Sequence, residues 1–253
     1  MGGKAHAVSW RDLDIELAEW RRAGRAPDFW WRDDDAGSAT QELASLLALQ
    51  KKTGIPLALA VIPANADPAL LAGLDAGVSV IQHGTDHVNR AGPGEKKTEF
   101  PAAEPPAAAV ARLSRSLGIL RDQAGPRFLP VLAPPWNRLS DALVPHLAGA
   151  GYAGLSRYGA RDKKETPLKQ VNTHVDIIAW QGNRGFVGEE AALRMTVSHL
   201  ASRRRGEVDA AEPTGLLTHH PLHDNACWRF LERLFAFTRE AGASWMKVSA
   251  LFQ

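Results

Sequence analysis

Residues 29–35 read Phe29-Trp30-Trp31-Arg32-Asp33-Asp34-Asp35, a short apolar run followed by three consecutive aspartates. The run predicts a buried strand over Phe29–Arg32, with the acidic cluster at its carboxyl end. Three adjacent carboxylates repel one another, so they need a cation or an arginine nearby. A solvated turn or a helix N-cap accounts for one aspartate. A metal site beside a general base accounts for two.

Apolar runs and helical periodicities alternate along the rest of the chain, and this pattern predicts repeated βαβ units around a mostly parallel sheet. We expect one α/β domain over residues 1–253, a distorted (β/α)7–8 barrel. A doubly wound open sheet is less favoured, because no glycine-rich phosphate fingerprint follows the first strand. Further strands are predicted at 56–62, 78–82, 128–132, 152–156, 175–180, 214–218 and 244–248, and helices at 41–52, 107–121, 140–148, 189–203 and 227–240.

The composition excludes several classes of protein. The chain has 253 residues, 45% of them hydrophobic and 23% charged, with a net charge of +2, as is usual for a soluble globular domain. No long basic run predicts nucleic-acid binding, and no apolar stretch is long enough to span a membrane. The first residues do not resemble a signal peptide, so we expect a cytoplasmic protein. The single cysteine, Cys227, excludes an intrachain disulfide, and the oligomeric state stays open.

Two segments break the alternation of strands and helices. Residues 88–106 are rich in Gly, Pro, Lys and Glu, and residues 161–170 are polar and basic. Long connections of this kind are often lids or binding loops, although a plain surface excursion fits equally well. We expect both to be active-site loops.

Polar clusters follow the predicted strands at their carboxyl ends. They are the aspartates after the first strand, His83-Gly84-Thr85-Asp86-His87, Pro134–Asn137, and His219-His220. In a βα barrel these ends converge on the face where active sites are built. His83 and His87 are four residues apart, which puts both rings on one side of a helical turn, a weak signal alone. Together with a carboxylate they form a recurring catalytic zinc set.

These residues resemble the polysaccharide deacetylase family, the carbohydrate esterases with a NodB-homology domain, over roughly Trp31 to His220. The family's Thr-Phe-Asp-Asp-Gly motif corresponds to residues 32–36, and its His-(Ser/Thr)-x-x-His motif to residues 83–87. The resemblance implies Asp34 as the catalytic base and Asp35, His83 and His87 as metal ligands. The implied ion is most simply Zn²⁺, with Co²⁺, Ni²⁺ or Mn²⁺ as alternatives.

Three later motifs extend the resemblance. Arg-x-Pro-Tyr corresponds to residues 133–136, Asp-x-x-Asp-Trp to residues 176–180, and Leu-x-His to residues 217–219. They imply an oxyanion donor in the backbone N–H of Trp136, and a general acid in His219 oriented by Asp176. His219 is preferred to His220 only by the Leu-x-His match. The expected substrate-binding residues are Pro135, Asn137, Trp180, Leu217 and His220.

The sequence departs from the family pattern at three positions. Ala133 replaces the arginine that pairs with the base, Ala179 replaces the second aspartate of the fourth motif, and Trp136 replaces tyrosine. Arg32 or Arg138 is the hypothesised source of the missing charge. The departures leave the metal ligands intact and bear on the environment of Asp34.

The resemblance implies a metal-dependent hydrolase that removes an acyl group, in the first place acetyl, from an N-acylated sugar. The partner would be a small-molecule or glycan substrate, such as a nucleotide- or lipid-linked precursor. Two alternatives stay open. One is hydrolysis of a non-sugar amide, such as a formamide or ureide, on the same barrel. The other is a catalytically degenerate carbohydrate-binding protein.

Overall fold

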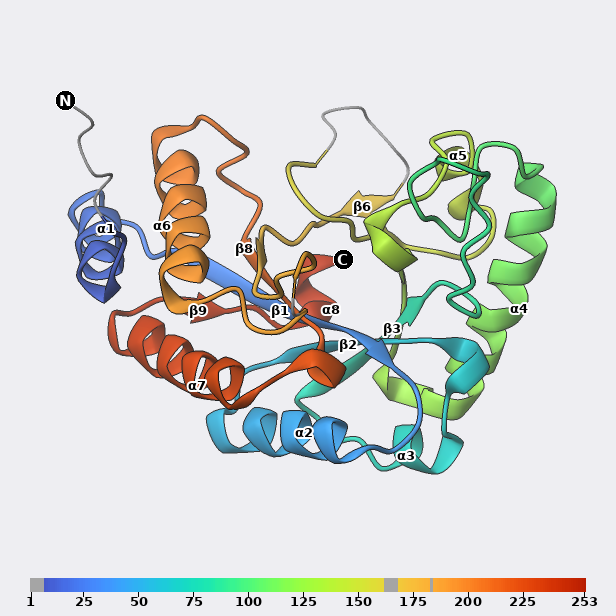
Figure 1. Ribbon diagram of the computed structural model, residues 1–253, viewed down its shortest axis with the longest axis horizontal. Helices are drawn as coiled ribbons and strands as arrows, with labels where there is room; N and C mark the ends of the chain where they lie inside the picture. Colours follow the sequence, from blue (N-terminus) through green and yellow to red (C-terminus); the bar gives the residue numbers. More distant parts are fainter. Residues whose placement is uncertain (1–6, 162–167, 183) are drawn as a thin grey trace.

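The computed structural model describes residues 7–161, 168–182 and 184–253. Its strands form one curled sheet in which every strand pairing is parallel (Figure 1). The order across the sheet is β6-β5-β4-β3-β2-β1-β8-β7, and β9 pairs with the start of β1. The strands are β1 (Asp28–Ala36), β2 (Leu57–Val61), β3 (Val78–His83), β4 (Phe128–Ala133), β5 (Gly154–Leu155), β6 (Lys169–Gln170), β7 (Val175–Asp176), β8 (Thr214–Thr218) and β9 (Ser244–Trp245).

Helices surround the sheet, and the predicted single-domain, barrel-like α/β fold is confirmed (Figure 1). Within the described ranges, the terminal strands β6 and β7 do not pair with each other, so the barrel is open between them. No described helix is long and apolar enough to cross a membrane. The helices are α1 (Trp10–Arg22), α2 (Gln41–Thr53), α3 (Pro68–Ala72), α4 (Pro106–Ala124), α5 (Val144–Leu147), α6 (Glu189–Arg205), α7 (Asn225–Glu240) and α8 (Val248–Leu251).

The predicted helix over 140–148 is wrong in length, since only Val144–Leu147 is helical and turns precede it. Pro145 lies in the first turn of α5, where its missing N–H is tolerated, and it cannot continue a helix that began earlier. The predicted strands at 152–156 and 175–180 shorten to two residues each. Helix α1 was not predicted, and it packs against α6 at the outer edge of the molecule.

Alternation along the strands divides the core in two. Side chains on the outer face of the sheet, such as Phe29 and Trp31, belong to the large cluster beneath the helices. Side chains on the inner face, such as Trp30, form a smaller cluster inside the barrel. Val248, Leu251 and Phe252 at the C-terminus belong to the inner cluster. The C-terminal segment therefore fills one end of the barrel.

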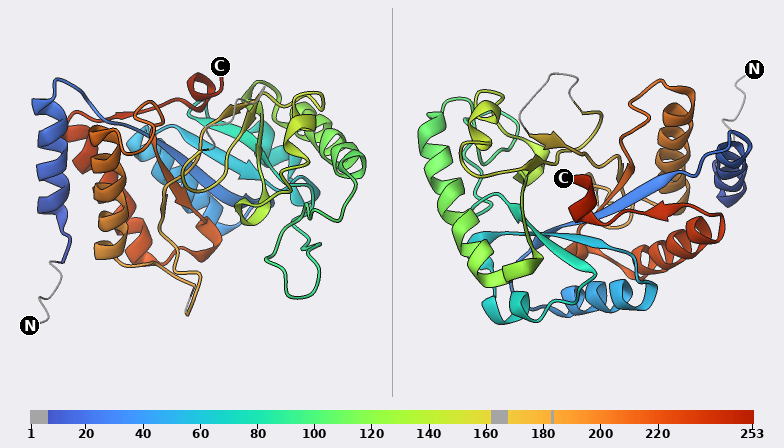
Figure 2. Two further views of the ribbon diagram at one scale, coloured as in Figure 1. Left: turned by 90° about the horizontal axis from the view of Figure 1, so that it is seen from above. Right: turned by 180° about the vertical axis from the view of Figure 1, so that it is seen from behind.

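The two ends of the barrel differ. In the left view of Figure 2, α8 lies at one edge of the molecule, and the segments near residues 90–100 and 184–188 project from the opposite edge. These segments follow the carboxyl ends of β3 and β7. Residues 88–106 run from the β3 side into α4, as predicted for a loop. In the second predicted loop, residues 162–167 lie outside the described residues.

Candidate active site

The three predicted metal ligands lie together at the carboxyl end of the sheet. Asp35 is near the end of β1, His83 is the last residue of β3, and His87 lies in the loop that follows. Oδ1 of Asp35 is 3.2 Å from Nε2 of His83 and 3.2 Å from Nε2 of His87. In the described part of the chain, this is the group of carboxylate and imidazole side chains near enough to share one ion.

The backbone of β1 explains how two neighbouring aspartates reach one pocket. Alternation holds as far as Asp34, so Arg32 and Asp34 face the barrel interior and Asp33 faces the helices. Asp35 then has a φ of 69°, in the left-handed region that non-glycine residues rarely adopt. This turn redirects the Asp35 carboxylate toward His83 and His87. Strained backbone of this kind is common at functional sites.

The donor atoms fit a divalent cation. Nδ1 of His83 lies 2.9 Å from the carbonyl oxygen of Ala133 and donates to it, so Nε2 is the ring atom that would present a lone pair to an ion. Oδ1 of Asp35 is buried and accepts no hydrogen bond from the described residues. The Asp35 oxygen and the two Nε2 atoms are therefore close enough together for one cation to bind all three. One carboxylate with two imidazoles is a ligand set that Zn²⁺ takes.

Arg32 supplies the charge that Ala133 cannot. Its side chain is completely buried, with Nε 2.9 Å from Oδ1 of Asp34 and Nη2 donating to Oδ2 of Asp34 at 3.0 Å. Nη1 donates to the hydroxyl of Ser156 at 2.7 Å, and Nη2 also donates to Oδ1 of Asn137 at 2.5 Å. The guanidinium is thus held from several sides and fixes the Asp34 carboxylate. Of the two hypothesised sources, Arg32 has this role and Arg138 lies at the pocket rim.

His219 approaches Asp34 from the end of β8. Its Nε2 is 3.8 Å from Oδ2 of Asp34, and its ring packs edge-on against Trp180 with the ring centroids 4.6 Å apart. Nδ1 of His219 has no hydrogen-bond partner among the described residues. The Asp176 carboxylate instead accepts a hydrogen bond from Nε1 of Trp180 at 2.7 Å. Asp176 therefore makes no direct hydrogen bond to His219, contrary to the predicted orientation of His219 by Asp176; it holds Trp180, whose ring packs against His219.

Burial raises the pKa of Asp176 above its ordinary value, although the neighbouring His219 charge and the Trp180 hydrogen bond act in the opposite direction. Desolvation disfavours the charged carboxylate, which makes a protonated Asp176 easier to reach than for an exposed aspartate. Asp176 is therefore a second titratable group near His219.

Asp33 lies on the outer face of the sheet, where its carboxylate makes structural hydrogen bonds. Its carboxylate accepts hydrogen bonds from the Thr218 hydroxyl at 2.6 Å and from the His220 backbone N–H at 3.1 Å. Nδ1 of His220 is 2.5 Å from Oδ1 of Asp33. Burial raises the pKa of Asp33, but the His220 charge and hydrogen bond outweigh it and lower the pKa. This cluster ties β1 to the end of β8 on either side of His219.

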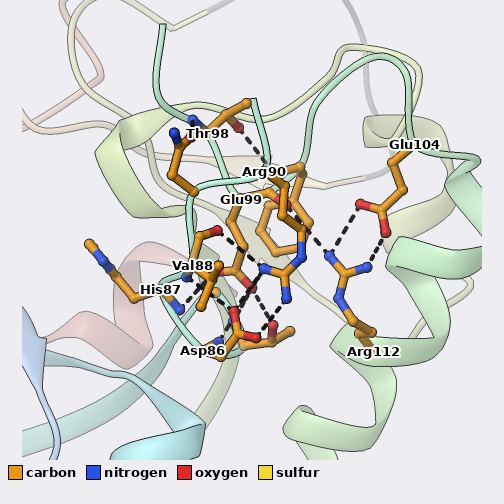
Figure 3. Close-up of polar contacts among 12 residues, drawn as sticks. Asp86, His87, Val88, Arg90, Thr98, Glu99, Glu104 and Arg112 are labelled. Atoms are coloured by element: carbon orange, nitrogen blue, oxygen red, sulfur yellow. Dashed lines mark hydrogen bonds and ion pairs between the residues drawn. The ribbon is translucent and has the colours of Figure 1, made fainter. Parts of the chain in front are cut away.

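Glu99 holds the loop that carries His87 (Figure 3). Its buried carboxylate accepts hydrogen bonds from the backbone N–H groups of Thr85 at 2.8 Å and His87 at 3.2 Å, and also from the Thr85 hydroxyl. A Cβ on Gly84 would lie 2.1 Å from Oε2 of Glu99, and Gly84 has a φ of 63°. The close approach therefore requires glycine. Glu99 was not predicted, since nothing in its local sequence indicates a contact so far back along the chain.

A pocket of about 440 Å³ opens above the metal ligands. Of the predicted residues, Trp136, Asn137, Trp180 and His219 line it with the three ligands. The rings of Trp136 and His87 are 4.4 Å apart between centroids. Pro135, Leu217 and His220 are buried and lie outside the lining, as does Asp34. The lining residues that sequence reasoning did not propose for substrate contact are Lys97, Arg138 and Arg184.

The fold occurs in solved structures of family 4 carbohydrate esterases. A peptidoglycan N-acetylglucosamine deacetylase is 14% identical with a TM-score of 0.61, over 89% of this chain and 88% of that one. A family 4 acetyl xylan esterase from Clostridium thermocellum, in complex with a cobalt ion, is 12% identical with a TM-score of 0.55, over 89% and 90%. A family 4 pseudoenzyme from Bacillus anthracis is 14% identical with a TM-score of 0.60, over 90% and 66%.

No family model matches the sequence, and no curated protein does. At identities this low the structural likeness establishes the fold. The chain therefore has the fold of the family 4 carbohydrate esterases and polysaccharide deacetylases, and the resemblance predicted from the ordered motifs is confirmed at that level.

Proposed function

We propose that this protein is a metal-dependent hydrolase that removes an acyl group, in the first place acetyl, from an N-acylated sugar. One observation carries the proposal: three side chains that could hold a divalent ion line one pocket together with His219, and the Asp34 carboxylate, paired with the buried Arg32, lies 3.8 Å from the His219 ring. The similar solved structures include deacetylases and an acetyl esterase, which supports the same class of reaction.

The residues would divide the chemistry among them. A divalent ion held by Asp35, His83 and His87 would polarise the acyl carbonyl and lower the pKa of water. Asp34, fixed by Arg32, would accept the proton of the attacking water. His219 would donate a proton to the departing amine nitrogen.

The turn after β4 would stabilise the negative charge on the former carbonyl oxygen. Trp136 has a φ of 55° and Asn137 a φ of 57°, so two consecutive residues adopt the left-handed region beside the ligands. We assign the backbone N–H of Trp136 as the oxyanion donor, a role that does not depend on its side chain. The replacement of tyrosine by tryptophan is therefore compatible with catalysis.

A catalytically degenerate binding protein is the second candidate. Ala133 and Ala179 favour it, and one of the similar structures is a pseudoenzyme. The buried Arg32–Asp34 pair counts against it, because a charge partner for the base is kept although it comes from another strand.

Replacing Asp34 by Asn separates the two candidates. For an enzyme, the variant should keep its bound zinc, measured by elemental analysis, and lose about 100-fold or more of the acetate release from N-acetylated sugars. Asp122→Asn, at an exposed position on α4, is the matched control. Binding of a sugar by wild type and Asp34→Asn alike, with no acetate released by either, would establish a binding protein. A panel that includes formamides tests the non-sugar alternative.

A further inference from the structure

The pocket above the ligands has a positively charged rim. Lys97, Arg138 and Arg184 line it and are exposed. Asp35 is the only carboxylate among the described lining residues, and its charge is directed at the ion site. The rim therefore carries a net positive charge at the place where a substrate would enter.

These three cations lack carboxylate partners among the described residues, whereas nearby arginines have them. Arg90 pairs with Asp86 at 2.6 Å, and Arg112 pairs with Glu104. Unpaired cations that gather around one pocket repel one another and raise the local positive potential. A bound anion relieves this repulsion, and a neutral ligand does not.

The rim is built by contacts between loops. Nη1 of Arg138 donates to the carbonyl of Lys97 at 3.2 Å, and the Thr98 hydroxyl donates to the carbonyl of Arg138 at 3.0 Å. The turn after β4 and the loop before α4 therefore hold two of the cations together. On the other side, the Arg184 guanidinium lies over the ring of Trp180 at 5.7 Å from its centroid.

Two tryptophans lie among the charges. Trp136 and Trp180 both line the pocket, and 43% of the Trp180 surface is exposed. Aromatic faces suit the apolar face of a sugar ring, while guanidinium groups match phosphate oxygens in a planar, two-pronged geometry. The pocket thus offers a stacking surface beside anion donors.

We propose that the pocket selects an N-acylated sugar that carries a phosphate or diphosphate ester. This inference rests on the proposed function and adds the class of substrate. A phosphate ester carries a charge near −2 at neutral pH and several strong acceptor oxygens, which matches a rim of separate cations better than a single carboxylate does. Neutral polymers would leave the rim uncompensated.

The test compares two probes that differ in one group, N-acetylglucosamine 1-phosphate and methyl N-acetylglucosaminide. Zinc-loaded wild type should have a kcat/KM about tenfold or more higher for the phosphate, and the preference should fall as salt rises from about 50 to about 500 mM. The triple variant Lys97→Gln, Arg138→Gln, Arg184→Gln should bring the two values close together. Arg229→Gln, an exposed charge on α7 outside the pocket, should keep the preference.

Calorimetric binding of the sugar phosphate gives a second readout that needs no turnover. Equal kcat/KM for both probes in wild type would overturn the inference about the phosphate and leave the proposed function standing. A phosphate preference that survives in the triple variant would also overturn the inference, because the ion site alone would then bind the anion. Binding that the triple variant loses, with no acetate released from either probe, supports the rim and overturns the proposed function. Nucleoside diphosphate and lipid diphosphate sugars as further probes distinguish the sources.

Discussion

Arg32 carries a role that the family pattern places on a different strand. In the motif order that this sequence resembles, the arginine beside the base belongs to the position of Ala133 on β4. Here the guanidinium comes from β1, two residues before Asp34. Side chains at i and i+2 of a strand share a face, so both groups enter the barrel together. Arg32 and the proposed base, Asp34, therefore lie on the same strand.

Replacing Arg32 by Met should leave the Asp34 carboxylate buried without its partner. Breaking a buried ion pair from one side costs about 3–5 kcal/mol, so the free energy of unfolding in urea should fall by that order. Acetate release should fall with it, because the base is no longer held in place.

The double variant Arg32→Thr, Ala133→Arg is the matched test of relocation. It returns the arginine to the position on β4, whose Ala133 side chain faces the same interior cluster. Recovery of part of the stability and part of the activity is expected. If the double variant were no better than Arg32→Thr alone, the two positions would not be equivalent.

Much of the site could be predicted at the level of residues, and the exceptions have physical reasons. Asp34, Asp35, His83 and His87 were found because ligands cluster at strand ends in ordered motifs. The sequence left Arg32 and Arg138 as equal candidates for the missing charge, and only the structure distinguishes them, by pairing Arg32 with Asp34. Glu99 and Lys97 lie in a loop without periodicity, where spacing carries no information about contacts.

The loop before α4 anchors His87, a predicted metal ligand, and also forms part of the pocket wall. Glu99 accepts the backbone N–H of His87, and Arg90 pairs with Asp86 in the same turn (Figure 3). Burial raises the pKa of Glu99, although hydrogen bonds from Thr85 oppose that shift. Residues 85–87 are thus held by the buried carboxyl group of Glu99, which is not one of the three predicted metal ligands.

Glu99→Gln should weaken metal binding while the ligands stay in place. The amide nitrogen takes the position of one oxygen and cannot accept a backbone N–H, so part of the support for residues 85–87 is lost. Loss of outer support around a metal ligand usually costs about 10- to 100-fold in affinity, and a zinc competition titration would measure it. Glu95→Gln, an exposed change in the same loop, should leave the affinity unaltered.

Elements with strong periodicity were predicted closely, and short ones were not. The strands at 78–82 and 214–218 match β3 and β8 to within a residue. β6 has two residues and depends on pairing with β5, which no local pattern reveals. In α1, Leu13, Leu17 and Trp20 are buried at helical spacing, so the signal for this helix was present.

At the scale of the whole molecule, a half-buried histidine outside the site, His199, is expected to affect stability. His199 on α6 stacks on His174 with the ring centroids 3.7 Å apart, and its Nδ1 lies 3.0 Å from the Thr214 hydroxyl. Burial lowers the pKa of His199 to about 3, and the charges of His174 and Arg203 act in the same direction. The folded protein therefore keeps this ring neutral under conditions in which the unfolded chain, with a pKa near 6.5, takes up a proton.

This difference predicts a loss of stability in acid. Because the folded pKa is the lower one, the contribution of His199 is complete above about pH 6.5 and falls by about 1.4 kcal/mol per pH unit toward pH 3. His199→Gln should remove this dependence. Between pH 7.5 and 4.5, the stability of wild type relative to the variant should drop by about 2–3 kcal/mol in urea unfolding with chelator present. His146→Gln, at an exposed position, is the control. If the difference in unfolding free energy between wild type and His199→Gln were the same at pH 7.5 and pH 4.5, the prediction would be wrong.

If His87 binds an ion as proposed, the contact between Glu99 and the backbone of His87 joins the loop and that ion in one equilibrium. Thermodynamic linkage is reciprocal: if the ordered loop stabilises the bound ion, the bound ion stabilises the ordered loop by the same free energy. A chain without its ion would then open first at this loop, where Lys96 and Lys97 offer cleavage points to proteases. In a cell, proteolysis would remove the unloaded molecules and leave a population enriched in the ion-bound form.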